Sequence, residues 1–271
     1  MIKKIICPVD FSEAAINGIE YAAKFAQACK AELHVINVQS LFPEAVISGE
    51  NMQETMQLAS DKLKAVCHDV SSVFQLSCSY DLEVTNSSLG KVIAKESEGE
   101  NVIVMGTNGI DDIYQYLFGT NTFNVIKKSQ SPVLLVPETI SYRNIKKIVF
   151  AWDYTPRNKA TVLKLKDIVG VFRSEVIFLQ ISRQFTNLNS DVYKISKEEL
   201  ASFLAETPNV KFDNFYSDEL EEGIDHYMLR SNADLLAITF HQRNLLSRIL
   251  HHSIVQEIST IASYPVLILP A

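Results

Sequence analysis

Several features that mark specialised classes of protein are scarce in this sequence. No apolar run approaches the roughly 20 residues that a membrane-spanning helix needs, so we expect no membrane partner. The formal net charge is −7, which argues against nucleic acid as a partner because surfaces that bind it are basic. The first residues lack the small-residue cleavage site of a signal peptide. These absences favour a cytoplasmic protein.

Cysteine is also rare, with four residues in the whole chain. No Cys-x-x-Cys motif occurs, and no cysteine–histidine set has the spacing of a zinc finger. We therefore expect buried free thiols in a reducing compartment. All four cysteines lie in the first half of the chain: Cys7, Cys29, Cys67 and Cys78.

The remaining composition is that of an ordinary globular protein, and its 271 residues suit two domains. Short apolar runs alternate with helical patterns through the first half. This alternation predicts an α/β fold in which helices cover both faces of a mostly parallel sheet. The predicted strands of the first half are residues 4–9, 33–38, 76–84, 102–105 and 133–136.

One stretch, from Val102 to Pro137, combines a buried strand with a glycine-containing loop and a helix start. Gly106 and Gly109 follow the strand directly, and glycine lets a backbone approach a ligand closely. Gly119 then precedes Thr120 and Asn121, which are residue types that cap helices. A helix start favours an anion such as phosphate. The alternative is that these glycines only form turns, because short glycine patterns are weak evidence.

The full spacing is more specific. Gly106-x-x-Gly109, nine residues, then Gly119-Thr120-Asn121 resembles the ATP-binding motif of the universal stress protein family. The ending Ser131-Pro132-Val133-Leu134-Leu135-Val136-Pro137 resembles that family too. The resemblance implies a doubly wound five-stranded sheet of order 3-2-1-4-5, like that of the adenine nucleotide alpha hydrolases. Strands 1 and 4 then lie side by side, so Asp10 and Gly106 end neighbouring strands at the edge where such sheets bind ligands.

The resemblance also implies a set of contacts to ATP. The end of the first strand looks like the adenine and ribose site, and the end of the second strand looks like a backbone contact to adenine. The glycines and the helix start should hold the phosphates, either alone or together with Mg²⁺. The predicted nucleotide-binding residues are Pro8, Val9, Asp10, Val38, Met105, Gly106, Gly109, Gly119, Thr120 and Asn121.

The second half of the chain repeats the first. Residues 146–153 correspond to residues 3–10, and residues 264–270 correspond to residues 131–137. We therefore expect two tandem copies of one fold, with domains at 1–140 and 141–271. By the family resemblance, the last strands of the two copies are expected to pair as an internal pseudo-dimer, which covers two sheet edges. A homodimer of two chains is the further possibility.

The second copy lacks the glycines. Thr239-Phe240-His241 stands where Met105-Gly106-Thr107 stood, with a gap of one residue in the loop, and a bulky side chain at Phe240 should block close approach of phosphate. Asp153 keeps the place of Asp10. Arg243 and Arg248 are either anion ligands or surface charges.

Two groups of residues could bind a metal ion, but we expect neither to do so. His241, His251 and His252 lack a nearby acid or cysteine that completes a ligand set by spacing. Asp111 and Asp112 are either ligands of Mg²⁺ or part of a solvated loop, and we expect the solvated loop.

Three functions fit these observations. The first is a regulatory stress protein that binds an adenine nucleotide in its first domain without strong catalysis, since no Walker lysine and no spaced base and nucleophile occur. The second is a slow ATPase or an adenylating enzyme, although Asp10-Phe11-Ser12 replaces the Ser-Gly-Gly loop of the adenylating enzymes considered. The third is an interaction module in which neither copy binds nucleotide.

Overall fold

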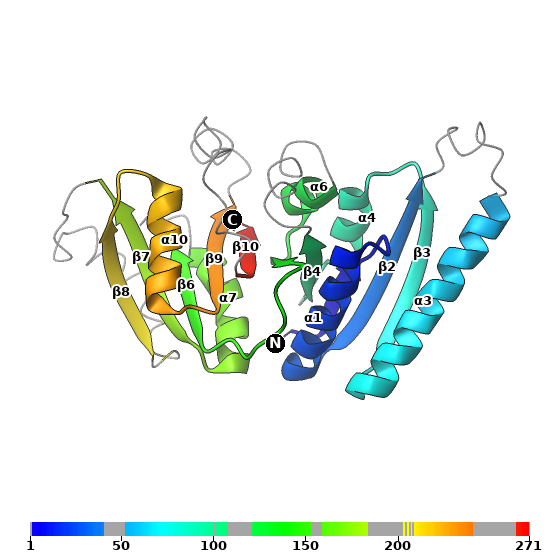
Figure 1. Cartoon of the computed structure of the whole chain (residues 1–271), viewed down its shortest axis with the longest axis horizontal. Coiled ribbons are helices and arrows are strands. Elements are labelled where there is room, and N and C mark those ends of the chain that lie inside the picture. Colours follow the sequence, from blue (N-terminus) through cyan, green and yellow to red (C-terminus); the bar gives the residue numbers. More distant parts are fainter. Residues whose placement is uncertain are drawn as a thin grey trace. The chain divides into compact units, whose positions relative to one another are not determined.

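The computed structural model divides the chain into two compact units, Met1–Tyr142 (unit 1) and Arg143–Ala271 (unit 2). Each unit is built of strands and helices that follow one another along the chain (Figure 1). The residues that the structure describes are 2–40, 52–99, 101–107, 121–152, 159–183, 203, 205, 207, 209–240 and 264–270.

The described part of unit 1 contains five strands in the order β3-β2-β1-β4-β5, and each strand pairs with its neighbours in parallel. The predicted order 3-2-1-4-5 is therefore confirmed. The strands are β1 (Lys4–Pro8), β2 (Glu32–Ser40), β3 (Cys78–Thr85), β4 (Asn101–Thr107) and β5 (Val133–Pro137). The helices among the described residues are α1 (Glu13–Cys29), α3 (Met52–Phe74), α4 (Leu89–Glu96) and α6 (Asn121–Lys128).

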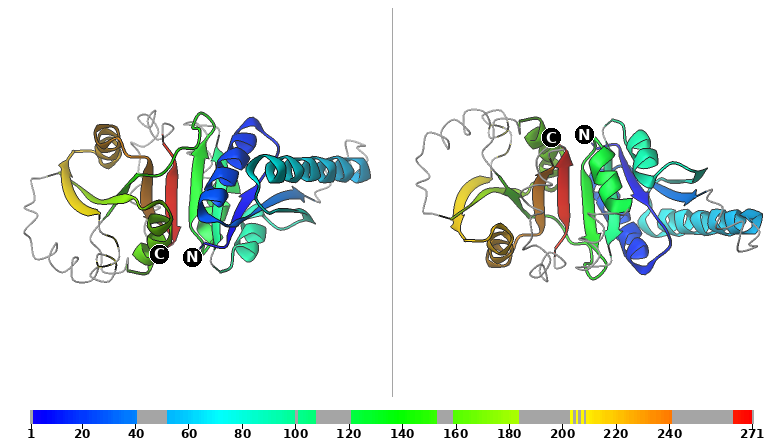
Figure 2. Two further views of the ribbon diagram at one scale, coloured as in Figure 1. Left: turned by 90° about the horizontal axis from the view of Figure 1, so that it is seen from below. Right: turned by 90° about the horizontal axis from the view of Figure 1, so that it is seen from above.

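The helices of unit 1 cover both faces of its sheet. Helices α1 and α4 lie on opposite sides of the strands (Figure 2). Helix α3 packs with α1, and α6 packs with α4. This arrangement follows from right-handed crossovers between parallel strands. It buries the strands on both sides, which is why β1, β4 and β5 are almost continuously apolar in sequence.

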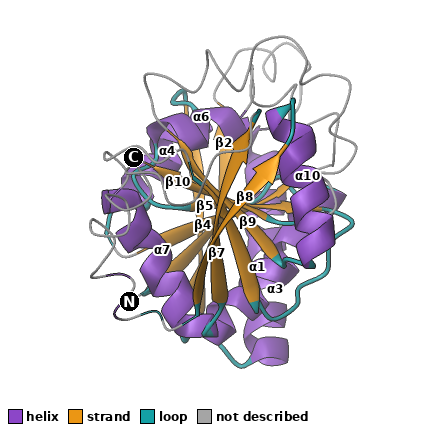
Figure 3. Cartoon of the chain, turned by 90° about the vertical axis from the view of Figure 1, so that its left-hand side faces the viewer, coloured by secondary structure: helices purple, strands orange, loops and turns teal. Residues whose placement is uncertain are grey.

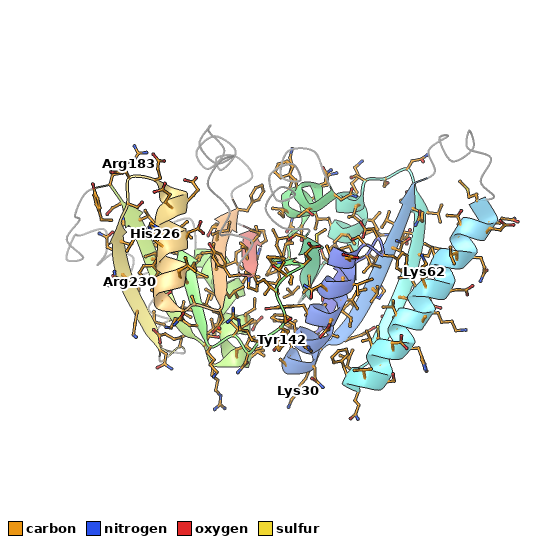
Figure 4. The ribbon with its side chains drawn as sticks, in the orientation of Figure 1. Lys30, Lys62, Tyr142, Arg183, His226 and Arg230 are labelled. Carbon is orange, nitrogen blue, oxygen red and sulfur yellow. The ribbon has the colours of Figure 1, made fainter. Side chains whose placement is uncertain are left out.

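Helix α1 illustrates how local sequence sets the elements. Ser12 is its N-cap and accepts a hydrogen bond from the backbone N–H of Ala15 at 3.2 Å. Glu13 lies in the first turn, where the helix dipole favours a negative charge. The helix ends at Cys29 and is capped by Lys30 (Figure 4), whose left-handed backbone lets its N–H reach the carbonyls of Ala26 and Gln27.

Unit 2 has the same order of strands. Its sheet runs β8-β7-β6-β9-β10, which is again 3-2-1-4-5 in chain order, with parallel pairs throughout. Helices lie on both sides of the strands (Figure 3). Among the described residues, the strands are β6 (Lys147–Ala151), β7 (Glu175–Ser182), β8 (Val210–Tyr216), β9 (Leu235–Phe240) and β10 (Val266–Pro270), and the helices are α7 (Lys159–Phe172) and α10 (Leu220–Ser231).

His34 is one of the buried polar residues in the sheet of unit 1. His34 in β2 is buried, and its Nδ1 lies 2.8 Å from the Oγ of Ser79 in the neighbouring strand. Its Nε2 lies 3.3 Å from an Asp81 oxygen. Burial lowers the pKa of His34, and the positive charge of Lys4 adds to this effect, although Asp81, Glu32 and Glu96 oppose it. Folding therefore favours the neutral form of the His34 imidazole.

Among the described helices, none combines the length and the apolar character needed to cross a membrane.

Candidate functional site

The first strand of unit 1 ends at the predicted site. Val9 is buried, and the Asp10 side chain that follows it is exposed. One Asp10 carboxylate oxygen accepts hydrogen bonds from the backbone N–H of Ser12 at 3.0 Å and from its hydroxyl at 2.7 Å. Asp10 thus holds the residue that caps α1.

Phe11, between Asp10 and Ser12, has a positive φ of 65°. This conformation is uncommon for a residue with a large side chain and costs on the order of 1 kcal/mol. The ring lies under the ammonium group of Lys62, 5.2 Å from its centroid, and Lys62 projects from α3 (Figure 4). The turn after β1 is therefore held by contacts from both α1 and α3.

The end of β2 is fastened to the end of β1 by a residue that the sequence interpretation did not select. Asn37 is only 2% exposed, and its amide donates to the carbonyl of Val9 at 2.7 Å. Gln39 donates in turn to the Asn37 side-chain oxygen at 2.6 Å. These bonds fix Val9 beside Val38, the half-buried residue predicted to contact adenine. A polar residue within the apolar run of a buried strand is the pattern that points to Asn37.

Strands β1 and β4 separate before they end. Their pairing stops at Ile6 and Ile103, but β1 continues to pair with β2 as far as Pro8. Strand β4 likewise continues to pair with β5 as far as Thr107. The cause lies in Pro8. Because the N–H of Val9 bonds to β2 at Ile36, the preceding nitrogen faces β4, and proline has no hydrogen to donate there. This separation is the topological switch point of the sheet.

Gly106 has a packing role that was not predicted. A Cβ at this position would lie 1.9 Å from the carbonyl oxygen of Ala14 in α1. Gly18 contributes from the helix side, since its Cβ would lie 2.7 Å from the nitrogen of Gly106. The two glycines let α1 approach β4 closely. The packing of α1 on β4 therefore requires glycine at position 106. The contact of Gly106 with phosphate stays a prediction.

Thr107, the last residue of β4, is 6% exposed, and its hydroxyl has no hydrogen-bond partner in the described structure. An unpaired buried hydroxyl costs about 1–3 kcal/mol. Met105, two residues earlier and on the same side of the strand, is buried. The carboxyl end of β4 therefore presents an unused polar group at the switch point.

Helix α6 is held against α4 by close packing. A Cβ on Gly90 would lie 2.2 Å from the carbonyl oxygen of Asn124, so only glycine permits this approach. Lys128 donates to the Ser88 hydroxyl at 2.8 Å. Asn121, the predicted phosphate contact, is exposed and begins the helix. Gly109, Gly119 and Thr120 lie outside the described residues.

The equivalent edge of unit 2 is built differently. Pairing of β6 with β9 continues to Ala151 and Ile238, two residues further than the corresponding pairing of β1 with β4. Ala151 stands where unit 1 has Pro8 and supplies the N–H that proline lacks. The strands of unit 2 therefore do not separate where those of unit 1 do.

Aromatic rings fill the core behind this edge of unit 2. Trp152 replaces Val9, is buried, and its ring lies 5.2 Å from Phe150 and 5.4 Å from Phe178. Phe178 in turn stacks on Phe212 at 5.0 Å. Aromatic contacts of this kind stabilise a core through their large buried area.

The alignment of the two halves needs a correction of one residue. Gly106 pairs with Val136 in unit 1, and Thr239 pairs with Leu269 in unit 2. Because the closing prolines of the two units correspond, Thr239 takes the place of Gly106, and Phe240 takes the place of Thr107. The predicted match of Phe240 with Gly106 is wrong, since the one-residue gap falls after the strand. Asp153, Arg243, Arg248 and the three histidines lie outside the described residues, as do Asp111 and Asp112.

No group of three or more metal-ligating side chains is present in the parts of the chain that the structure describes.

Known proteins resemble both the sequence and the fold. Residues 1–137 match the model of the universal stress protein family. The universal stress protein MJ0577 of Methanocaldococcus jannaschii is 29% identical over 157 residues, covering 50% of this chain and 95% of that protein. MJ0531 of the same organism is 27% identical over 143 residues, covering 50% and 82%. A universal stress protein from Archaeoglobus fulgidus has a similar structure, with a TM-score of 0.72, 17% identity, and coverage of 98% of this chain and 96% of that chain.

Proposed function

The chain belongs to the universal stress protein family, and we propose that its first unit binds ATP or another adenine nucleotide at the carboxyl edge of the sheet. The observation that carries this proposal is the separation of β1 from β4 beyond Ile6 and Ile103. Asp10 and Thr107 lie at the ends of the two strands, and the glycine motif of the sequence follows directly. Ligands of open α/β sheets bind at such a switch point.

The roles of the residues follow from their chemistry. An exposed Asp10 carboxylate suits the hydroxyls of a ribose, to which it accepts hydrogen bonds. Backbone groups at Val9 and Val38, fixed by Asn37, suit the edge of an adenine ring. The Thr107 hydroxyl gains a partner when a polar ligand enters, which removes the cost of its isolation. Phosphates suit the amides that begin α6 and the preceding glycines. Mg²⁺ would neutralise part of the triphosphate charge there.

The biological role that we propose is regulatory. Bound nucleotide would shift a conformation or a partner contact through its different affinity for two states. Slow hydrolysis of ATP is the alternative, and an interaction module that binds no nucleotide is the second alternative. The cytoplasmic location expected from the sequence stays a prediction.

We propose that unit 2 is a degenerate copy of the same domain. The longer pairing of β6 with β9, the ring of Trp152 and the Cβ of Thr239 all oppose nucleotide binding in the manner of unit 1. As a further part of the proposal, β5 and β10 pair with each other, because each ends the row of strands of its own unit and an unpaired edge invites aggregation. A homodimer of two chains would add to this internal pseudo-dimer.

Calorimetry with ATP, ADP and AMP tests the proposed site. Thr107→Val keeps the side-chain shape but removes the hydroxyl, so we expect nucleotide affinity to fall about ten-fold while the stability of the apo protein is unchanged or higher. Asp10→Asn should also weaken binding, and Asp153→Asn is the matched control in unit 2. Unchanged affinity in both unit 1 variants would refute the site.

Phosphate release from the same preparations separates the functions. Binding without turnover supports regulation. Turnover that Gly109→Val abolishes supports the ATPase, and absence of binding supports the interaction module. Gly119→Val should abolish binding under either of the first two functions, because a branched side chain closes the loop to phosphate.

A further inference from the structure

Two of the four cysteines lie in contact. Cys67 is in α3 and Cys78 begins β3, and their sulfur atoms are 2.7 Å apart. All four cysteines are free thiols. A disulfide bond is about 2.05 Å long, so bond formation requires the two sulfurs to approach by only roughly 0.7 Å. The pair is therefore already arranged for covalent closure.

The two thiols differ in their exposure to solvent. Cys67 is 6% exposed and lies 3.3 Å from the carbonyl oxygen of Ser79. Cys78 is half-buried, so small molecules reach the pair from its side. Cys7 and Cys29 are both buried, and burial raises the pKa of each to about 12, which keeps them as unreactive thiols.

We propose that Cys67 and Cys78 form a redox modification site that reacts with a peroxide and closes as an intramolecular disulfide. The site lies between α3 and β3, and it stands independently of the proposed nucleotide function. Its closure joins residues 11 positions apart in the sequence and ties the last turns of α3 to the sheet.

The chemistry balances with hydrogen peroxide as the only co-reactant. The Cys67 thiolate attacks one peroxide oxygen, the O–O bond breaks, and one water leaves after it takes up a proton, so that Cys67 becomes a sulfenic acid. The Cys78 sulfur then attacks the Cys67 sulfur and displaces the hydroxyl as a second water. The two sulfurs lose two electrons, which reduce the peroxide, and the two thiol hydrogens end in the two waters.

The assignment of Cys67 as the nucleophile rests on the contact between the thiols. Either thiol can donate in this contact, and donation from Cys78 to the Cys67 sulfur lowers the pKa of Cys67 against the opposing effect of burial. The same contact and burial raise the pKa of Cys78. A thiolate is the reactive form of cysteine, so the buried sulfur acts first and the more accessible one resolves it.

Mass spectrometry of the full-length protein tests the proposal. Trypsin cuts after Lys64 and Lys91, which leaves both cysteines in one peptide. Treatment with a few-fold excess of hydrogen peroxide should lower the mass of this peptide by two hydrogen atoms and reduce the free thiols of the denatured protein from four to two. A second cut after Phe74 should separate the two halves of the peptide only when a reductant is present. Addition of dithiothreitol should restore all four thiols.

Single variants examine the order of the steps. Cys78→Ser should leave a sulfenic acid on Cys67 that dimedone labels, whereas Cys67→Ser should abolish labelling at Cys78. Cys29→Ser is the matched control and should form the bridge at the rate of the unmodified chain. The proposal is overturned if the wild-type peptide keeps its mass, if the bridge includes Cys7 or Cys29, or if irreversible sulfinic acid accumulates in place of the bridge.

Discussion

Replacement of Gly106 by alanine should separate α1 from β4. The new Cβ would lie 1.9 Å from the carbonyl oxygen of Ala14 and 2.6 Å from its carbon. Ordinary van der Waals contacts of a Cβ begin at 3.4 Å, so the helix backbone must move by about 1.5 Å. Overpacking costs about 1–3 kcal/mol when neighbours adapt. A helix backbone adapts less than a flexible side chain, so we expect a loss of about 3 kcal/mol.

Denaturation followed by hydrogen exchange measures this loss for unit 1 by itself. The amides of α1 and β4 should exchange faster in Gly106→Ala, because their opening becomes easier. Gly170→Ala is the matched control, since a Cβ at Gly170 would meet nothing within 4 Å and the residue is exposed in α7. Alanine favours a helix over glycine, so this control should gain about 0.5–1 kcal/mol.

A double-mutant cycle makes the reasoning refutable. Gly18→Ala places its Cβ 2.7 Å from the nitrogen of Gly106, so it should also push α1 away from β4. Once one alanine has displaced the helix, the second should cost less, and the two losses should sum to more than the loss in the double variant. Losses that add fully, or a Gly106→Ala variant within about 0.5 kcal/mol of the unmodified protein, would show that the close approach does not limit stability.

Three further perturbations follow from the described structure. Pro8→Ala supplies an N–H that faces β4, so the pairing of β1 with β4 should extend past Ile6. Hydrogen exchange of the amide at residue 8 should then be slow, and nucleotide affinity should fall about 2- to 10-fold. A rapidly exchanging amide at residue 8 would contradict this expectation. Asn37→Ala leaves the Val9 carbonyl unpaired and should cost about 1–3 kcal/mol in urea denaturation, whereas an unchanged midpoint would deny the bond. Burial lowers the pKa of His34, so the unfolded chain binds its proton first, and unit 1 should lose stability as the pH falls below about 6.5. His34→Gln should lessen that loss in denaturation curves measured across this pH range.

Much of unit 1 could be predicted from its sequence, because the relevant patterns are local. Apolar runs predicted the strands, and the family resemblance predicted the strand order. Asp10 and the end of β4 were placed on neighbouring strands by that order alone. The structure confirms this order and the α/β class.

The missing parts depend on contacts between residues distant in sequence. The approach of Gly106 to Ala14 and the bond from Asn37 to Val9 need the packed fold before they can be recognised. The contact of Cys67 with Cys78 depends on where α3 lies against the sheet. The strand β8 was not assigned from sequence, and its half-buried, mixed residues explain why.

The longer ladder between β6 and β9 has a consequence for protein engineering. A graft that copied only the glycine loop of unit 1 into unit 2 would leave the amide of Ala151 bonded across the sheet. The transplanted loop would then lie over strands that are still paired with each other. A second functional pocket would first require the pairing of β6 with β9 to be broken near its end, beginning with a proline at position 151.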